Sequence, residues 1–161
     1  MRLFLAIITI LLCSCSTPSE LQSISLDGVW VPDWDATIEA SSAHSNDAYV
    51  AAMSLRNAWE NTDVYTHLFR DGTSWHQAPA ANWYLVGTWS VADKQLEIRT
   101  HFFHDPESRE NTSQFVIQDH QLMYVLDKDV YGPVMVYKRA NAPREDKRNW
   151  TVDQVYKADS P

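Results

Sequence analysis

The most regular part of the sequence is a stretch of alternating apolar and polar residues that runs from Trp83 to Arg99. A period of two is typical of strands with one face in a core, and the Asp93-Lys94 pair between the two halves predicts a hairpin turn. Short turns join the neighbouring segments, so we expect about eight antiparallel strands. The other strands are expected at 26–31, 63–69, 73–77, 112–118, 121–127 and 134–139.

One segment changes period between the first strand and the hairpins. From Asp47 to Glu60, Ala48, Ala52, Leu55 and Trp59 recur at helical spacing, which predicts a single helix. Residues 33–46 are polar without a clear period, and we expect them to be irregular.

Each predicted strand carries apolar residues on one face only. With one helix available to cover it, such a sheet must close on itself to hide this face and its two edges. We therefore predict a mainly β protein: an antiparallel up-and-down barrel of about eight strands over residues 24–140, followed by a C-terminal tail at 141–161. The inward residues are expected to be Trp83, Leu85, Gly87, Trp89, Val91, Leu96, Ile98, Thr100, Phe102, Phe115, Ile117, Leu122, Tyr124, Val134 and Val136.

The N-terminus has the composition of an export signal. Arg2 precedes an apolar run from Leu3 to Leu12, which is too short to span about 30 Å of hydrocarbon. The following Leu12-Cys13-Ser14-Cys15 resembles the lipobox of bacterial lipoproteins. That resemblance implies a signal peptide at 1–14, a lipid-modified Cys15 and a tether at 15–23; the alternative is an ordinary secretory signal.

The lipobox resemblance also implies a location. The protein would be anchored to a membrane of the bacterial cell envelope through acyl chains on Cys15. In families that sort by the next residue, aspartate retains the protein at the inner membrane, whereas this chain has Ser16. We therefore expect the outer membrane, with the domain facing the periplasm.

Cysteine content and charge exclude several functions. Cys13 would leave with the signal and Cys15 would become a thioether, so the processed chain would have neither a disulfide nor a cysteine metal site. Removing Arg2 leaves 12 basic against 21 acidic side chains, which argues against a nucleic-acid partner.

A second resemblance concerns the barrel itself. Gly28-x-Trp30 on the first strand and Arg139, or Lys138, on the last resemble the lipocalin-like, calycin-type barrels, as found in small bacterial lipoproteins. In that family the tryptophan packs near the arginine at the closed end of the barrel. The resemblance covers roughly residues 24–140, but lipocalins carry their helix after the barrel rather than between the first strands.

Aromatic residues are frequent, with seven tryptophans in the chain. They either line a cavity for an apolar ligand or simply fill a small barrel. The candidate ligand-binding residues are Tyr65, Phe69, Trp83, Trp89 and Tyr124.

Two histidines form a further hypothesis. If Asp71-Gly72 were a two-residue loop, His67 and His76 would lie opposite each other with Cβ atoms about 5 Å apart. Such a pair is suited to zinc or copper with a third ligand, or to a pH switch. More often it is only half-exposed on a hairpin, and we predict no metal.

No motif pairs a nucleophile with a base, and no glycine loop for phosphate is present. We therefore expect no catalytic residues, no cofactor and no enzyme. The leading hypothesis is a lipid-anchored envelope protein whose barrel binds a small apolar or amphipathic ligand. The alternative is a protein-interaction module, an inhibitor or assembly accessory with a filled barrel, that presents residues 33–46 and 104–111. No particular protein partner is indicated.

Overall fold

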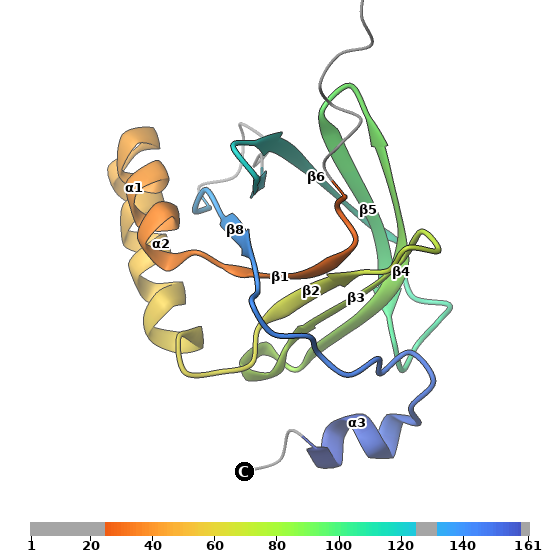
Figure 1. Cartoon of the computed structure of the whole chain (residues 1–161). Coiled ribbons are helices and arrows are strands. Elements are labelled where there is room, and N and C mark those ends of the chain that lie inside the picture. Colours follow the sequence, from red (N-terminus) through yellow and green to blue (C-terminus); the bar gives the residue numbers. More distant parts are fainter. Residues whose placement is uncertain (1–24, 125–131, 159–161) are drawn as a thin grey trace, which may run out of the picture.

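A computed structural model describes residues 25–124 and 132–158. In these residues eight antiparallel strands form a closed barrel in sequence order, with the first strand hydrogen-bonded to the last (Figure 1). This confirms the predicted fold class. The strands are β1 Gly28–Pro32, β2 Tyr65–Leu68, β3 Thr73–Ala78, β4 Trp83–Ala92, β5 Gln95–Phe102, β6 Asn111–Gln118, β7 Gln121–Tyr124 and β8 Val136–Arg139.

Tight turns connect the longest strands as the sequence predicted. Between β4 and β5, Asp93 and Lys94 both have positive φ, at 49° and 66°, and Ala92 pairs with Gln95. Positive φ at both central residues is the conformation of a type I′ turn, whose twist matches that of the flanking strands. The β4–β5 hairpin is therefore confirmed at the expected position.

Two helices lie between β1 and β2, where the sequence predicted one. Helix α2, Asn46–Trp59, matches the predicted segment, and Ser45 caps it by accepting the Ala48 N–H at 3.1 Å. Helix α1, Trp34–His44, occupies the segment that was expected to be irregular, so that expectation was wrong. The remaining helical elements are a 3-10 turn, η2 Pro79–Ala81, and a C-terminal helix, α3 Val152–Ala158.

Helix α1 was missed because its buried face is polar. Its buried residues are Thr37 and Ser41, which are one helical turn apart and give no apolar period. Both hydroxyls bond the backbone of the segment that leads into β8, at Val136 and Val134 respectively. Helix α1 therefore lies along β8 beyond the point where β1 ends, as Figure 1 shows.

The interior of the barrel contains an apolar cluster, here called the interior cluster. Trp89, Ile117 and Tyr124 pack against it, as the alternation predicted. In β8 and the two residues before it the prediction was wrong: Met135 and Tyr137 join the interior, whereas Val134 and Val136 lie on the opposite face. The buried members are Leu26, Trp30, Leu68, Leu96, Ile98, Phe115, Leu122, Met135 and Tyr137.

A second apolar cluster lies on the outer face of the first four strands and is here called the outer cluster. The segment expected as a tail crosses this face, and Val155 of α3 is fully buried in the cluster (Figure 1). Residues 141–158 therefore pack on the barrel as part of the same folded unit. The buried members are Val29, Tyr65, Trp75, Tyr84 and Val155, with Phe69, Phe103 and Trp150 packed against them.

The predicted signal peptide, Cys15 and the tether at 15–23 lie outside the described residues. Within residues 25–124 and 132–158, no helix combines the length and apolar character that crossing a membrane requires.

Candidate ligand-binding site

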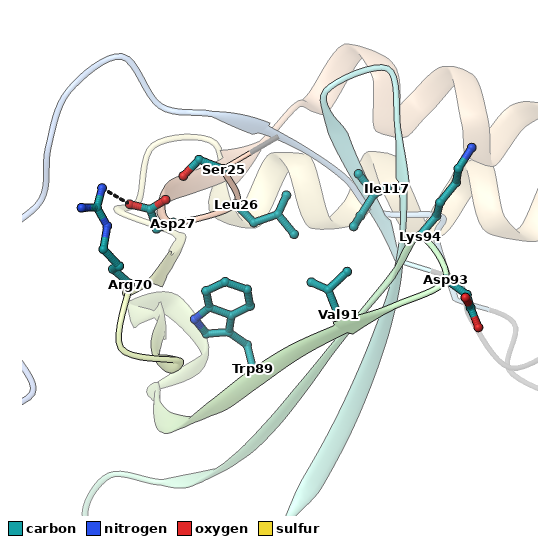
Figure 2. Close-up of a pocket in the computed structure, with 9 residues that line it drawn as sticks. All are labelled: Ser25, Leu26, Asp27, Arg70, Trp89, Val91, Asp93, Lys94 and Ile117. Carbon is teal, nitrogen blue, oxygen red and sulfur yellow. Dashed lines mark hydrogen bonds and ion pairs between the residues drawn. The ribbon is translucent and has the colours of Figure 1, made fainter. Parts of the chain in front are cut away.

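A cavity of about 450 Å³ opens at the end of the barrel where the described chain enters β1 (Figure 2). It lies between the start of β1, the β2–β3 turn, the β4–β5 hairpin and the end of β6. The lining residues are Ser25, Leu26, Asp27, Arg70, Trp89, Val91, Asp93, Lys94 and Ile117.

The walls of the cavity are apolar. Figure 2 shows Leu26, Trp89, Val91 and Ile117 pointing toward a common space from β4, β6 and the segment before β1. The Trp89 indole is held in place, because its Nε1–H donates to the carbonyl of Phe69 at 2.9 Å. Val91 keeps 46% of its surface exposed, which is unusual for a large apolar residue on the inward face of a barrel. An apolar molecule entering here would remove this surface from water.

The inner limit of the cavity is the packed interior. Leu26 belongs to the interior cluster, and Trp89 and Ile117 pack against it. Beneath them Trp30, Leu68 and Leu96 are almost completely buried. Among the described residues, the cavity is therefore a pocket at one end of the barrel that packed side chains close on its inner side.

One edge of the cavity carries both signs of charge. A guanidinium nitrogen of Arg70 lies 3.4 Å from the carboxylate of Asp27, and the Arg70 side chain is 90% exposed. On the opposite side Asp93 and Lys94 point away from the apolar space (Figure 2). The polar side chains at this edge of the cavity are therefore those of Asp27 and Arg70, together with the Ser25 hydroxyl.

The structure does not bring the five candidate ligand-binding residues together. Only Trp89 lines the cavity. Tyr65 and Phe69 lie in the outer cluster, under the C-terminal segment. Trp83, 45% exposed, packs edge-on against Trp59 with ring centroids 6.1 Å apart, and Tyr124 packs on Phe115 beside the interior cluster.

The register of β2 and β3 separates the two histidines. The turn contains three residues, since Phe69 N–H bonds the Thr73 carbonyl and Gly72 has φ +82°. His76 consequently pairs with Thr66, and His67 with Trp75, so the imidazoles lie on opposite faces of the sheet. Their predicted juxtaposition was wrong. Among the described residues, no group of three histidine, cysteine or acidic side chains is placed to hold a metal ion.

Each histidine has its own environment. His76 is on the inward face, where its Nδ1 lies 2.8 Å from the Thr66 hydroxyl and burial lowers its pKa to about 4. His67 is stacked on Phe69 in the outer cluster with ring centroids 3.9 Å apart. Burial lowers the pKa of His67 too, while the Asp146 carboxylate opposes this shift and Arg148 adds to it.

The Trp30–Arg139 contact that the calycin resemblance implies is present, but it lies beside the cavity, since these side chains bond the carbonyls of Leu26 and Ser25, and not at a closed end. The guanidinium carbon of Arg139 lies 5.3 Å from the centre of the Trp30 ring, and the two residues are partners across the β1–β8 ladder. A closed antiparallel barrel with this contact is compatible with a calycin-like fold. Comparisons with protein-family models, with curated proteins and with solved structures found no match to this chain.

Proposed function

We propose that this protein is a lipid-anchored cell-envelope protein whose barrel binds a small apolar or amphipathic ligand in the cavity beside Trp89. The observation that carries the proposal is the cavity itself: about 450 Å³ in volume, with an apolar wall and a charged edge. Small-molecule sites commonly measure about 300–1,000 Å³ and have this distribution of apolar walls and few polar groups.

The energetics favour an apolar occupant. Each methylene group that leaves water for an apolar surface contributes about 0.8 kcal/mol. Leu26, Val91 and Ile117 offer only hydrocarbon to a ligand, and Trp89 adds a large flat surface. Because the lining side chains supply apolar contacts and an ion pair, we propose binding rather than catalysis, with no cofactor.

The anchoring part of the proposal depends on the sequence around Cys15. Ser25 lines the cavity, so the cavity opens at the end of the barrel where the first described residue lies. Residues 16–23 span at most about 25 Å when fully extended. A domain tethered in this way keeps the cavity close to a membrane surface, and Ser16 favours the outer membrane, facing the periplasm.

A chain that begins at Ser16 is suited to the binding test. All eight strands and both apolar clusters lie between residues 25 and 158, so this chain retains the whole folded unit. Titration with N-phenyl-1-naphthylamine, an uncharged apolar fluorophore, should give saturable binding. Val91→Phe, which fills the cavity, should weaken binding about tenfold or more, whereas Val50→Phe on the exposed face of α2 should leave it unchanged.

The possible results separate clearly. Saturable binding that Val91→Phe does not affect would contradict the cavity as the site. The anchor is tested separately by labelling cells with radioactive palmitate. We expect the processed protein to carry the label and the Cys15→Ala variant to lack it. An unlabelled wild-type protein would contradict the anchor.

One observation favours the alternative function, a protein-interaction module. At the strand end opposite the cavity, Trp83 is exposed beside Trp59, and exposed aromatic residues are common in protein interfaces. Of the two segments expected to contact a partner, 33–46 contains helix α1, and 104–111 is mostly exposed. If this surface is the functional one, Trp83→Ser should abolish the cellular function while fluorophore binding stays intact.

A further inference from the structure

We infer that the ligand of the cavity is a single-chain amphiphile with a zwitterionic head group, which places its hydrocarbon chain on Trp89 and its two charges on Asp27 and Arg70. This inference rests on the proposed function and specifies the class of ligand.

The size of the cavity limits the apolar part of the ligand. At about 450 Å³ it lies in the lower half of the range for small-molecule sites. Its inner wall is the surface of the interior cluster, in which Leu68 and Leu96 are fully buried. A chain entering between Val91 and Ile117 therefore meets packed side chains and cannot extend through the barrel. A cavity of this volume suits one hydrocarbon chain better than the paired chains of an intact phospholipid.

The Asp27–Arg70 ion pair at the edge is weak enough to be replaced by contacts with a ligand. Its N···O distance is 3.4 Å, whereas charge-assisted hydrogen bonds are about 2.7–2.9 Å long. A guanidinium group has five N–H donors, and one from Arg70 reaches Asp27. The loose contact leaves Arg70 able to bind a phosphate with two parallel hydrogen bonds and leaves Asp27 able to receive a cation.

The balance of charge selects the head group. Arg70 would attract a carboxylate head group but Asp27 would repel it. Asp27 would attract a simple cation but Arg70 would repel it. A phosphate that carries an ammonium group satisfies both side chains at once. The remaining charged lining residues, Asp93 and Lys94, also have opposite signs, so they give the edge no net preference for an anion or a cation.

The experiment uses four probes with the same twelve-carbon chain and different head groups. They are dodecylphosphocholine, dodecanoate, dodecyltrimethylammonium and dodecyl maltoside, each titrated below its micelle concentration into the chain that begins at Ser16. Isothermal calorimetry should show dodecylphosphocholine binding about tenfold more tightly than either singly charged probe, a difference within the range of one hydrogen bond to a charged group.

Two charge-removing variants assign the charges. Asp27→Asn should weaken dodecylphosphocholine and strengthen dodecanoate, and Arg70→Gln should weaken dodecylphosphocholine and strengthen dodecyltrimethylammonium. The matched control is Arg99→Gln, which breaks the exposed Arg99–Glu97 pair on the outer face of β5 and should change none of the affinities.

Each outcome has a distinct meaning. Equal binding of all four probes, or tightest binding of dodecanoate, would overturn the zwitterionic head group while leaving the ligand cavity in place. Binding of none of the probes, together with no saturable binding of the uncharged fluorophore, would overturn the proposed function itself.

Discussion

The hydroxyl of Thr37 bonds both backbone groups of Val136, accepting from its N–H at 2.9 Å and donating to its carbonyl at 3.3 Å. Ser41, one turn later on α1, does the same at Val134, with distances of 2.9 and 3.4 Å. Beyond Pro32, where β1 ends, these two side chains supply the hydrogen bonds that a neighbouring strand supplies elsewhere. Helix α1 therefore continues the barrel wall along one side of β8.

We expect Thr37→Val to destabilise the fold by about 1–3 kcal/mol. Valine has nearly the same shape, but it leaves the buried N–H of Val136 without its partner, and an unsatisfied buried group costs about 1–3 kcal/mol. The Val136 carbonyl keeps the Asp33 N–H as its donor, at 2.8 Å. Urea unfolding followed by circular dichroism measures the change. Thr112→Val on the exposed part of β6 is the control, and an equal loss in both variants would contradict the role of Thr37.

Gly87 should not tolerate a side chain. A Cβ atom at this position would lie 1.8 Å from the carbonyl oxygen of Arg99 on β5, so Gly87→Ala must push the two strands apart. Overpacking of this kind costs about 1–3 kcal/mol, and we expect the upper end. Gly72→Ala serves for comparison, because its Cβ meets no atom closer than 3.9 Å and its φ of +82° alone should cost about 1 kcal/mol. Thermal unfolding should therefore show a larger drop in melting temperature for Gly87→Ala than for Gly72→Ala.

Acid should destabilise the protein through His76. Burial lowers its folded-state pKa to about 4 from the ordinary 6.5, so between these values the unfolded chain binds a proton that the folded chain does not. Stability is therefore full above about pH 6.5 and falls as the pH drops toward 4, by at most about 3 kcal/mol. His67, whose pKa is also lowered, adds a loss of the same sign.

The variant His76→Gln isolates this contribution. Glutamine remains neutral over the whole interval and retains groups that can bond the Thr66 hydroxyl. We expect urea unfolding at a series of pH values to show that the free energy of unfolding falls less steeply with acid in His76→Gln than in the wild type. His120→Asn, in the exposed β6–β7 turn, should keep the wild-type decline, and an unchanged slope in His76→Gln would refute the assignment.

Arg148 fastens the C-terminal segment to the barrel. Its guanidinium carbon lies 3.4 Å from the centre of the Phe69 ring, and its nitrogens contact Asp71 at 2.8 Å and Asp146 at 2.7 Å. We expect Arg148→Gln to cost about 1–2 kcal/mol, mainly through the cation–π contact. It should also speed proteolysis within residues 140–158. Arg99→Gln is again the control, and equal proteolysis of the two variants would show that Arg148 does not hold the segment.

The sequence predicted the barrel because alternation is a local signal. The inward residues of β4 and β5, such as Trp89 and Ile98, follow directly from a period of two, and the Asp93-Lys94 turn sets their register. Helix α1 could not be predicted in this way, since Thr37 and Ser41 face polar backbone rather than an apolar layer. Its one local sign was an N-cap: Asp33 accepts the Ala36 N–H at 3.3 Å.

The candidate site was harder to predict than the fold. Val91 and Ile117 were correctly assigned to the inward face, but their position at an open end depends on how strand lengths and turns align around the barrel. One extra residue in the β2–β3 turn sufficed to separate His67 from His76. Phe69 and Tyr65 are covered by a C-terminal segment that is distant in sequence, and no local pattern signals such a cover.

The pairing of β1 with β8 has a consequence for how the chain is synthesised and folds. Because the first strand receives its second neighbour only from residues 136–139, any chain shorter than this carries two unpaired strand edges, which invite aggregation. Closure requires contacts between residues more than a hundred positions apart, and such distant contacts slow folding. If the chain is exported as proposed, β1 would leave a translocation pore well before its second neighbour, β8, and the partly assembled sheet would need shielding from aggregation during that interval.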